Sequence, residues 1–496
     1  MHVNLLSTVL IPPLTSKVYA PSGINQAGRP SAEDGARFSI FSVVWAIATL
    51  FHMAQSRIYA VQFQYVLLTL AALALIAKPS SVVRLLVLIG VQLYEVFFKL
   101  PDVSNHWIFT TFVNLTILQA LLFLVVKNKS LRVDKEELLR AFAPAIRIEL
   151  LLLYFFVVLH KLNWDFFSTE ASCAAVLYKA QHLDALVTTS NPILLFNIYL
   201  TIFIEALIPL FLIFRKTRNI GVLIGLCFHC IIAFNSYNGF YDFSAMVFAV
   251  YFLFTNTTFS NTLLSVSEKA LALKATIKKQ FADFSFQNVL LIGVLIVASL
   301  LAIKVFATIF QDHFQVLWGA YSISFILLFL LSFTNKTPQA QGVRNSFRLP
   351  SVVFLLFPVA VFLNGMSPYL GLKTETSFAM FSNLRTEGGV TNHFFIPISA
   401  QVFNFQKDMV EVVSSSDPGL QKLAAENKLL PFFKFKNYVA TTRPAQVVYV
   451  RNGQQQAFTL ATASPNDELI RKSSFILRKT MGFRAINKLG PQPCQH

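Results

Sequence analysis

The sequence has little charge for its length. Of its 496 residues, only 13% are Asp, Glu, Lys or Arg, whereas 55% are hydrophobic and 51 are phenylalanine. A soluble domain carries about 25% charged residues, so this chain has about half of the charge that a water-exposed surface needs. An ordinary soluble protein is therefore excluded, and the surplus apolar side chains are expected to face lipid.

Cysteine is also scarce, with Cys173, Cys227, Cys230 and Cys494 only. They are too few for a disulfide-rich fold, and they do not indicate a compartment. Cys227 and Cys230 form a CxxC pair inside an apolar helical run without a second pair, so we expect them to pack rather than to bind metal. The polar residues 1–38 lack the pattern of a cleaved signal peptide.

Motifs of several enzyme classes are missing. The sequence has no HxxxH or HExxH pair and no carboxylate–histidine pair on one helical face, so no metal site is predicted. It also lacks a glycine-rich phosphate loop and a GxSxG motif, which excludes ordinary kinases, dinucleotide-binding enzymes and hydrolases. The net charge of +17 does not indicate nucleic-acid binding, because membrane proteins collect Lys and Arg in cytoplasmic loops.

Long apolar runs dominate what is present. About eleven segments are long or nearly long enough to cross roughly 30 Å of hydrocarbon as helices. They cover residues 39–56, 62–77, 83–98, 106–126, 146–162, 193–214, 219–235, 241–255, 288–310, 314–334 and 350–369. We therefore predict an all-α polytopic membrane protein with about nine to eleven transmembrane helices.

Basic residues are concentrated in every second loop between these segments, over residues 78–84, 127–147, 215–218, 269–279 and 336–348. The positive-inside rule places such loops in the cytoplasm. The amino-terminal tail is then cytoplasmic as well. An odd number of spans puts the carboxy-terminal tail on the periplasmic or lumenal side, so we expect a multi-pass protein of the bacterial inner membrane or the endoplasmic reticulum membrane.

The composition along the chain predicts five consecutive parts. They are a cytoplasmic tail over 1–38, a transmembrane domain over 39–260, a cytoplasmic amphipathic loop over 261–287, further transmembrane helices over 288–370 and a non-cytoplasmic soluble tail over 371–496. The tail regains ordinary polarity and contains alternating strand-like runs, with Asn452-Gly453 as a hairpin turn. We expect a small mixed α/β domain there.

Polar side chains inside the apolar segments are functional candidates, because an ionisable one costs roughly 2.5–3.5 kcal/mol at a helix centre on insertion scales. Glu205 lies in the middle of its segment, so it is expected to be protonated or paired. The other places are Asn105-His106, Lys161 with Trp164, and His229. Each of these also has a structural explanation, such as interfacial anchoring, snorkelling or a packed hydrogen bond.

The same residues resemble a known family. Over roughly residues 40–260 the chain resembles the vitamin K-dependent gamma-carboxylase family and its bacterial relatives, the HTTM (horizontally transferred transmembrane) proteins. The resemblance rests on stretches in the same order, namely Asn105-His106; Arg147, Tyr154, Lys161-Leu162 and Trp164; Glu205; and Arg218, Gly221 and Phe228-His229-Cys230. The segment 377–393 is similar to a signature of the HTTM relatives.

This resemblance implies a chemistry. In the carboxylase a lysine deprotonates a reduced quinone, which reacts with oxygen to give an epoxide and a strong base. That base removes a glutamate proton, and carbon dioxide adds to the carbanion. By resemblance Lys161 is the initiating base, and Asn105 and His106 hold the quinone oxygen. The expected cofactor is a reduced isoprenoid quinone from the bilayer, without a metal, and the remaining substrate-binding residues are Arg147, Tyr154, Trp164, Glu205 and His229.

The chain also departs from the family. His160 stands where the family has a second lysine, and the tail is much shorter than the carboxylase region that binds a propeptide. Carboxylation of a protein substrate is therefore not predicted.

Three functions stay open at this point. The first is a membrane enzyme, a carboxylase-like or quinone-epoxidising lyase or oxidoreductase. The second is a non-enzymatic protein that binds lipid or a partner. The third is a proton-coupled transporter with Glu205 next to Pro209 on a broken helix. Membrane lipid and a lipid-soluble small molecule are the expected partners, and nucleic acid is not.

Overall fold

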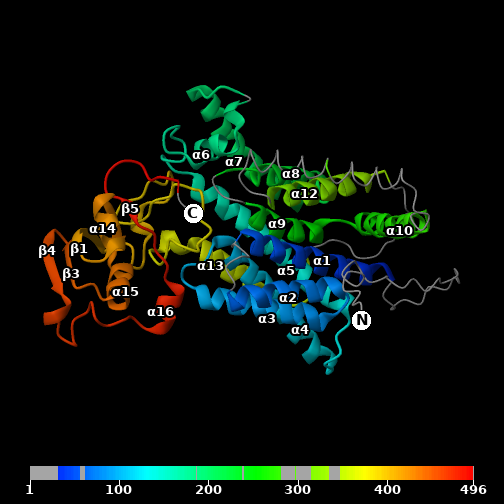
Figure 1. Cartoon of the computed structure of the whole chain (residues 1–496), viewed down its shortest axis with the longest axis horizontal. Helices are drawn as coiled ribbons and strands as arrows, with labels where there is room; N and C mark the ends of the chain where they lie inside the picture. The colour runs from blue at the N-terminus through cyan, green and yellow to red at the C-terminus, as the bar shows by residue number, and fades with distance from the viewer. Residues whose placement is uncertain are drawn as a thin grey trace. The chain divides into compact units, whose positions relative to one another are not determined.

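The computed structural model describes residues 32–55, 62–185, 187–236, 240–280, 297, 314–334 and 347–494. Helices predominate in these residues, and a five-stranded antiparallel sheet lies near the carboxyl terminus (Figure 1). The predicted class, a helical polytopic protein with a small α/β domain, is confirmed. Most of the predicted amino-terminal tail lies outside the described residues.

Most helices before the sheet follow the predicted apolar segments, and α6 and α10 are additional to them. They are α1 Ala32–Gln55, α2 Phe63–Ala77, α3 Val82–Lys99, α4 Asn105–Asn128, α5 Lys135–Lys161, α6 Cys173–Ala180, α7 Asn191–Ile213, α8 Arg218–Ile232, α9 Tyr241–Phe254, α10 Thr257–Gln280, α12 Phe314–Leu331 and α13 Leu356–Leu370. Each predicted segment coincides with a helix, apart from 288–310, which lies outside the described residues except for residue 297.

Six described helices are long and apolar enough to cross a membrane by themselves, and a seventh span results if α9 and α10, bent by 115°, count as one. Helices α2 and α8 have 15 residues each. They are about 22 Å long, which is shorter than the hydrocarbon core. Among the described residues, the expected nine or more crossings are reached only when such short helices are counted.

The chain divides into two compact units, each built from separated stretches. The first unit combines Met1–Leu93, Asn114–Arg147 and Leu210–Phe354. The second unit combines Tyr94–Val113, Ile148–Pro209 and Leu355–His496. The five consecutive parts drawn from composition stay a prediction. Composition along the chain does not reveal which distant stretches pack together.

In the first unit, α1 and α9 lie side by side and antiparallel (Figure 1). At one end the Arg37 guanidinium donates to the carbonyl oxygens of Thr255 (3.0 Å) and Asn256 (2.8 Å), where α9 ends. At the other end His52 Nδ1 lies 2.7 Å from Asp242 Oδ2. Helix α9 is apolar and buried almost all round, as expected of a helix in the centre of a bundle.

In the second unit the sheet has the strand order β4-β3-β1-β2-β5. Its elements are β1 Met409–Ser415, α14 Pro418–Ala425, β2 Lys428–Pro431, α15 Phe432–Thr442, β3 Gln446–Arg451, β4 Gln454–Thr459, α16 Phe475–Thr480 and β5 Ile486–Asn487. Phe435 and Val439 of α15 pack with Val447 and Tyr449 of β3 in its core. The predicted hairpin is confirmed, since Asn452 and Gly453 adopt φ of 51° and 76° between paired strands.

A disulfide joins Cys173, the first residue of α6, to Cys494, across 321 residues of sequence. Asn383 supports the same junction, because its Oδ1 accepts from the Cys173 backbone N–H (2.8 Å) and its Nδ2 donates to Ala171 and Gln492 carbonyl oxygens. Cysteine spacing alone did not predict this bond. Disulfides persist in oxidising compartments. The bond is therefore an argument about which side of the membrane α6 and the carboxyl terminus face.

Loss of this disulfide is expected to destabilise the second unit. Cys173→Ser should lower the free energy of unfolding by about 2–4 kcal/mol, because the unfolded chain loses a cross-link. Thermal unfolding in detergent measures this, and Cys227→Ser serves as the control because Cys227 is a free thiol. Denatured, unreduced protein should bind maleimide at Cys227 and Cys230 only; labelling of Cys173 or Cys494 without reductant would contradict the bond.

Candidate functional site

A buried ion pair links two apolar helices of the second unit. Lys161 is the last residue of α5, and its Nζ lies 2.6 Å and 2.5 Å from the two carboxylate oxygens of Glu205 on α7. Both side chains are buried. The Nζ also lies 5.8 Å from the centre of the buried Phe166 ring, within the range of a cation–π contact. The expectation that Glu205 is protonated or paired is consistent with this contact.

The pair lies well inside the span of α7. At a rise of 1.5 Å per residue, Glu205 is about 21 Å from Asn191 and about 12 Å from Ile213, the two ends of the helix. Helix α7 runs without a break through Pro209. The transporter hypothesis required a broken helix here, and α7 does not provide one.

Asn163 closes the end of α5 just beyond the ion pair. Its backbone N–H donates to the Lys161 carbonyl (2.9 Å), and its Nδ2 donates to the carbonyls of His160 (2.8 Å) and Ser382 (2.7 Å). The final carbonyl groups of a helix have no partner within the helix and need one when they are buried. The fully buried Asn163 supplies it, and it ties α5 to a distant segment at the same time.

Residues beyond Asn392 complete this closure. His393 Nε2 donates to the Leu159 carbonyl (3.0 Å), and the Phe394 N–H donates to the Leu162 carbonyl (3.0 Å). His393 Nδ1 accepts from the N–H groups of Phe395 and the following residue, so its proton lies on Nε2. An imidazole used on both nitrogens in this way has a structural role.

The segment 377–393 packs against the ends of α4 and α5. Asn105 Oδ1, at the start of α4, accepts from the Phe378 N–H (2.6 Å). His160 Nε2 lies 3.2 Å from the Ser377 carbonyl, and its Nδ1 lies 2.9 Å from Tyr369 Oη. The sequence singled out this segment without assigning a role. In the second unit it contacts the start of α4 and the end of α5, and we call residues 377–393 the wedge.

The backbone is strained in the first residues of this wedge and in the residue just before it. Thr376, Phe378 and Phe381 adopt φ of 59°, 68° and 52°. Residues other than glycine rarely adopt such left-handed conformations, which cost about 1–3 kcal/mol each. The hydrogen bond from Phe378 to Asn105 holds one of them in place.

The other predicted site residues fall in two places. In the second unit His106 is half-buried with Nε2 3.3 Å from Ser104 Oγ, Tyr154 is buried, and Trp164 is exposed. Arg147 and His229 belong to the first unit. There Arg147 donates to the Leu253 carbonyl (2.7 and 3.0 Å), and His229 Nδ1 lies 3.5 Å from Ser244 Oγ. Lys161 and Glu205 are thus two predicted residues that contact each other directly.

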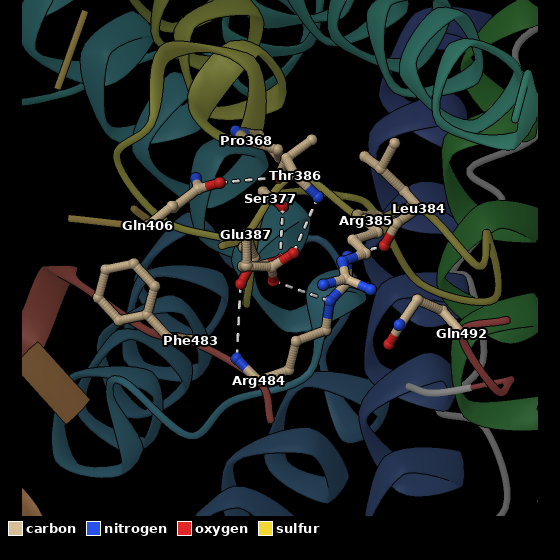
Figure 2. A network of polar contacts seen from close by, with 12 residues as sticks. Pro368, Ser377, Leu384, Arg385, Thr386, Glu387, Gln406, Phe483, Arg484 and Gln492 are labelled. Carbon is tan, nitrogen blue, oxygen red and sulfur yellow. Dashed lines mark hydrogen bonds and ion pairs between the residues drawn. The ribbon is translucent and has the colours of Figure 1, made fainter. Parts of the chain in front are cut away.

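A second buried charge pair joins the wedge to Arg484 near the carboxyl terminus (Figure 2). Arg484 Nε lies 3.2 Å from Glu387 Oε1, and the Arg484 guanidinium also donates to the Leu384 carbonyl. Glu387 Oε2 accepts from the Thr386 N–H (2.9 Å), and Thr386 Oγ1 donates to Gln406 Oε1 (2.7 Å). Each charge is therefore paired and hydrogen-bonded, which burial requires.

Sequence reasoning missed four buried polar residues that join distant segments of the second unit. Asn163, Asn383, His393 and Arg484 lie in stretches of ordinary polarity, where a polar side chain is not unusual. A buried asparagine just after an apolar helix, as in Leu162-Asn163, is a signal that could have been used, because helix ends need such partners.

No protein family model matches this chain, and no curated protein or solved structure matches it either. The resemblance to the carboxylase family stays a prediction.

Removal of one member of the ion pair is expected to destabilise the protein more than removal of both. Glu205→Leu leaves the Lys161 charge buried without a partner, which costs about 3–5 kcal/mol. The double variant Lys161→Met, Glu205→Leu should recover most of this loss in thermal unfolding. Lys179→Met, at an exposed lysine of α6, is the matched control. A double variant as unstable as Glu205→Leu would contradict the pairing.

Lys373, just after α13, gives a prediction of pH dependence. Burial lowers the pKa of its ammonium group from 10.5 to about 8, and Nζ donates to Thr376 Oγ1 at 2.9 Å. The folded state therefore binds this proton less tightly than the unfolded state. The destabilisation is complete below pH 8 and is relieved as the pH rises toward 10.5.

Lys373→Met should therefore raise the unfolding midpoint at pH 7, and its advantage over the wild type should shrink by pH 10. The gain at pH 7 should be about 2 kcal/mol, since loss of the hydrogen bond offsets part of the relief. Lys422→Met, at an exposed lysine, should show no such trend. A constant difference from pH 7 to pH 10 would show that Lys373 titrates normally.

Proposed function

We propose that this protein is a multi-pass membrane enzyme that takes a proton from a weakly acidic, lipid-soluble substrate. Lys161 is the accepting base, and Glu205 holds the proton that Lys161 must first release. The observation that carries the proposal is the buried contact of 2.5–2.6 Å between the two side chains inside the span of α7.

The apolar surroundings make this pair suited to proton transfer. In water, separated charges are strongly favoured over a neutral amine and a neutral carboxylic acid. In a low-dielectric interior both charges lose their hydration, so the neutral pair becomes comparable in free energy. Transfer of one proton from Lys161 Nζ to a Glu205 oxygen leaves an uncharged amine, which is the form that accepts a proton from a substrate.

The substrate class follows from the resemblance stated above. A reduced isoprenoid quinone carries an acidic hydroxyl group on an apolar body, and it reaches protein through the bilayer. When bound it would supply the electrons for reaction with oxygen. Asn105 Oδ1 already accepts from Phe378, so contact with a quinone oxygen would come from the Asn105 amide nitrogen, with His106 beside it in sequence. Tyr154 and Trp164 would line the apolar approach.

The proposed orientation places the amino terminus in the cytoplasm and the carboxy-terminal part in the periplasm or lumen. The distribution of basic residues supports it. The disulfide between Cys173 and Cys494 supports it independently, because both cysteines then face an oxidising compartment.

The test is turnover of reduced menaquinone by the purified protein in liposomes with oxygen, with product epoxide measured by mass spectrometry. Lys161→Ala should lower the rate by about 100-fold or more, as expected when a general base is removed. Glu205→Gln keeps the shape but cannot hold the proton as an acid, so it should also be slow. Lys179→Ala should retain the rate.

Two results would refute the proposal. One is the absence of epoxide with folded wild-type protein. The other is an unchanged rate for Lys161→Ala. If the wild-type protein makes no epoxide and the Lys161 and Glu205 variants change only thermal stability, the pair is structural and the non-enzymatic class is favoured.

A further inference from the structure

The stretch from Gly388 to Gln406 has an unusual composition for a domain surface. It contains no Asp, Glu, Lys or Arg, and it lies in the part of the chain that the sequence assigns to a soluble tail. Two of its side chains, Phe395 and Val402, are 72% and 73% exposed. Exposed apolar side chains in a charge-free stretch indicate a surface that does not face bulk water.

Hydrogen bonds fix this stretch at the ends of two membrane-spanning helices. The Phe394 N–H donates to the carbonyl of Leu162, which directly follows α5 (3.0 Å). The Phe403 N–H donates to the carbonyl of Leu370, the last residue of α13 (2.9 Å). Phe395 and Val402 therefore lie close to the level at which α5 and α13 end.

Aromatic rings connect this stretch to the outer face of a third helix. The Trp164 ring lies 4.7 Å from Phe394, Phe394 lies 5.4 Å from Phe167, and Phe167 lies 5.3 Å from Tyr199 of α7. Tyr199 is exposed, and so are its neighbours Phe196 and Phe203 on the same helical face. In the part of the chain that the structure describes, this face of an apolar helix is exposed.

We propose that residues 388–406, together with Trp164, form a ledge that lies in the boundary between headgroups and acyl chains of the bilayer. The occupant of this surface is phospholipid, because the ledge continues the lipid-facing side of α7. Tryptophan, phenylalanine and tyrosine are the side chains that favour this boundary. The inference goes beyond the proposed function and does not depend on it.

The position of the ledge also sets the depth of the Lys161–Glu205 pair in the bilayer. Tyr199 is six residues from Glu205, which is about 9 Å along the axis of α7. A bilayer boundary at the ring cluster therefore places the Lys161–Glu205 pair below the headgroups, within the hydrocarbon.

Tryptophan fluorescence in liposomes tests the ledge. Three of the four tryptophans, Trp45, Trp107 and Trp318, are buried, so a Trp164→Phe background removes the exposed one. In that background Phe395→Trp places a probe on the ledge. Val413→Trp is the matched control, because Val413 is an exposed apolar residue on β1 of the sheet.

Each variant is reconstituted with phosphatidylcholine brominated on its acyl chains near the headgroup, and separately titrated with aqueous iodide. The Phe395→Trp probe is expected to lose emission with the brominated lipid and to keep it with iodide. The Val413→Trp probe should show the reverse. Retention of the Cys173–Cys494 disulfide, measured by thiol labelling, confirms that both variants are folded.

Two outcomes would overturn the proposal. Quenching of the Phe395→Trp probe by iodide but not by brominated lipid means that the ledge faces water. Protection from both quenchers means that protein covers it, as in contact with a second copy of the chain. Neither outcome changes the result expected in the epoxide assay. The two experiments therefore test the ledge and the proposed enzyme activity independently.

Discussion

The end of helix α5 imposes the constraint on which the second unit depends. A helix that stops inside an apolar environment leaves carbonyl groups that water cannot reach, and each must find a donor within the protein. Asn163 and His393 are those donors, and both lie on backbone that does not form a regular helix. The wedge over 377–393 brings His393 to the end of α5 and supplies the Ser382 carbonyl that accepts from Asn163. Its left-handed residues strain the same segment.

Because α5 ends at Lys161, a charged side chain lies in an apolar environment, where it is unfavourable without a partner. The ammonium group of a terminal Lys161 usually reaches water by extending along the helix axis. Here the wedge occupies the space beyond the helix end, and the side chain turns to Glu205 on α7 instead. The same arrangement serves stability, since it pairs two buried charges, and it provides a proton donor and acceptor in contact. Structure and proposed chemistry therefore rest on one contact, which is why stability and turnover must be measured on the same variants.

Much of the fold could be predicted from the sequence, because its causes are local. Apolar runs locate the helices, since only helices satisfy their own backbone in lipid, and Asn452-Gly453 locates a hairpin through its left-handed preference. Lys161 and Glu205 could be singled out because charged residues are rare in such runs. Their contact could not be predicted, because it depends on which faces of α5 and α7 meet. The same applies to Cys173 and Cys494 and to Arg484 with Glu387, whose partners are distant along the chain and carry no periodic pattern.

The long separation of the disulfide has a consequence for how the protein is made. Cys494 is synthesised only after every described helix, whereas Cys173 is synthesised 321 residues earlier. Until the late partner arrives, α6 is without the covalent bond and Asn383 is without its contact to Gln492. Oxidation of this cysteine pair is therefore a late maturation event, and it distinguishes a finished second unit from one that has inserted its helices but has not yet been locked.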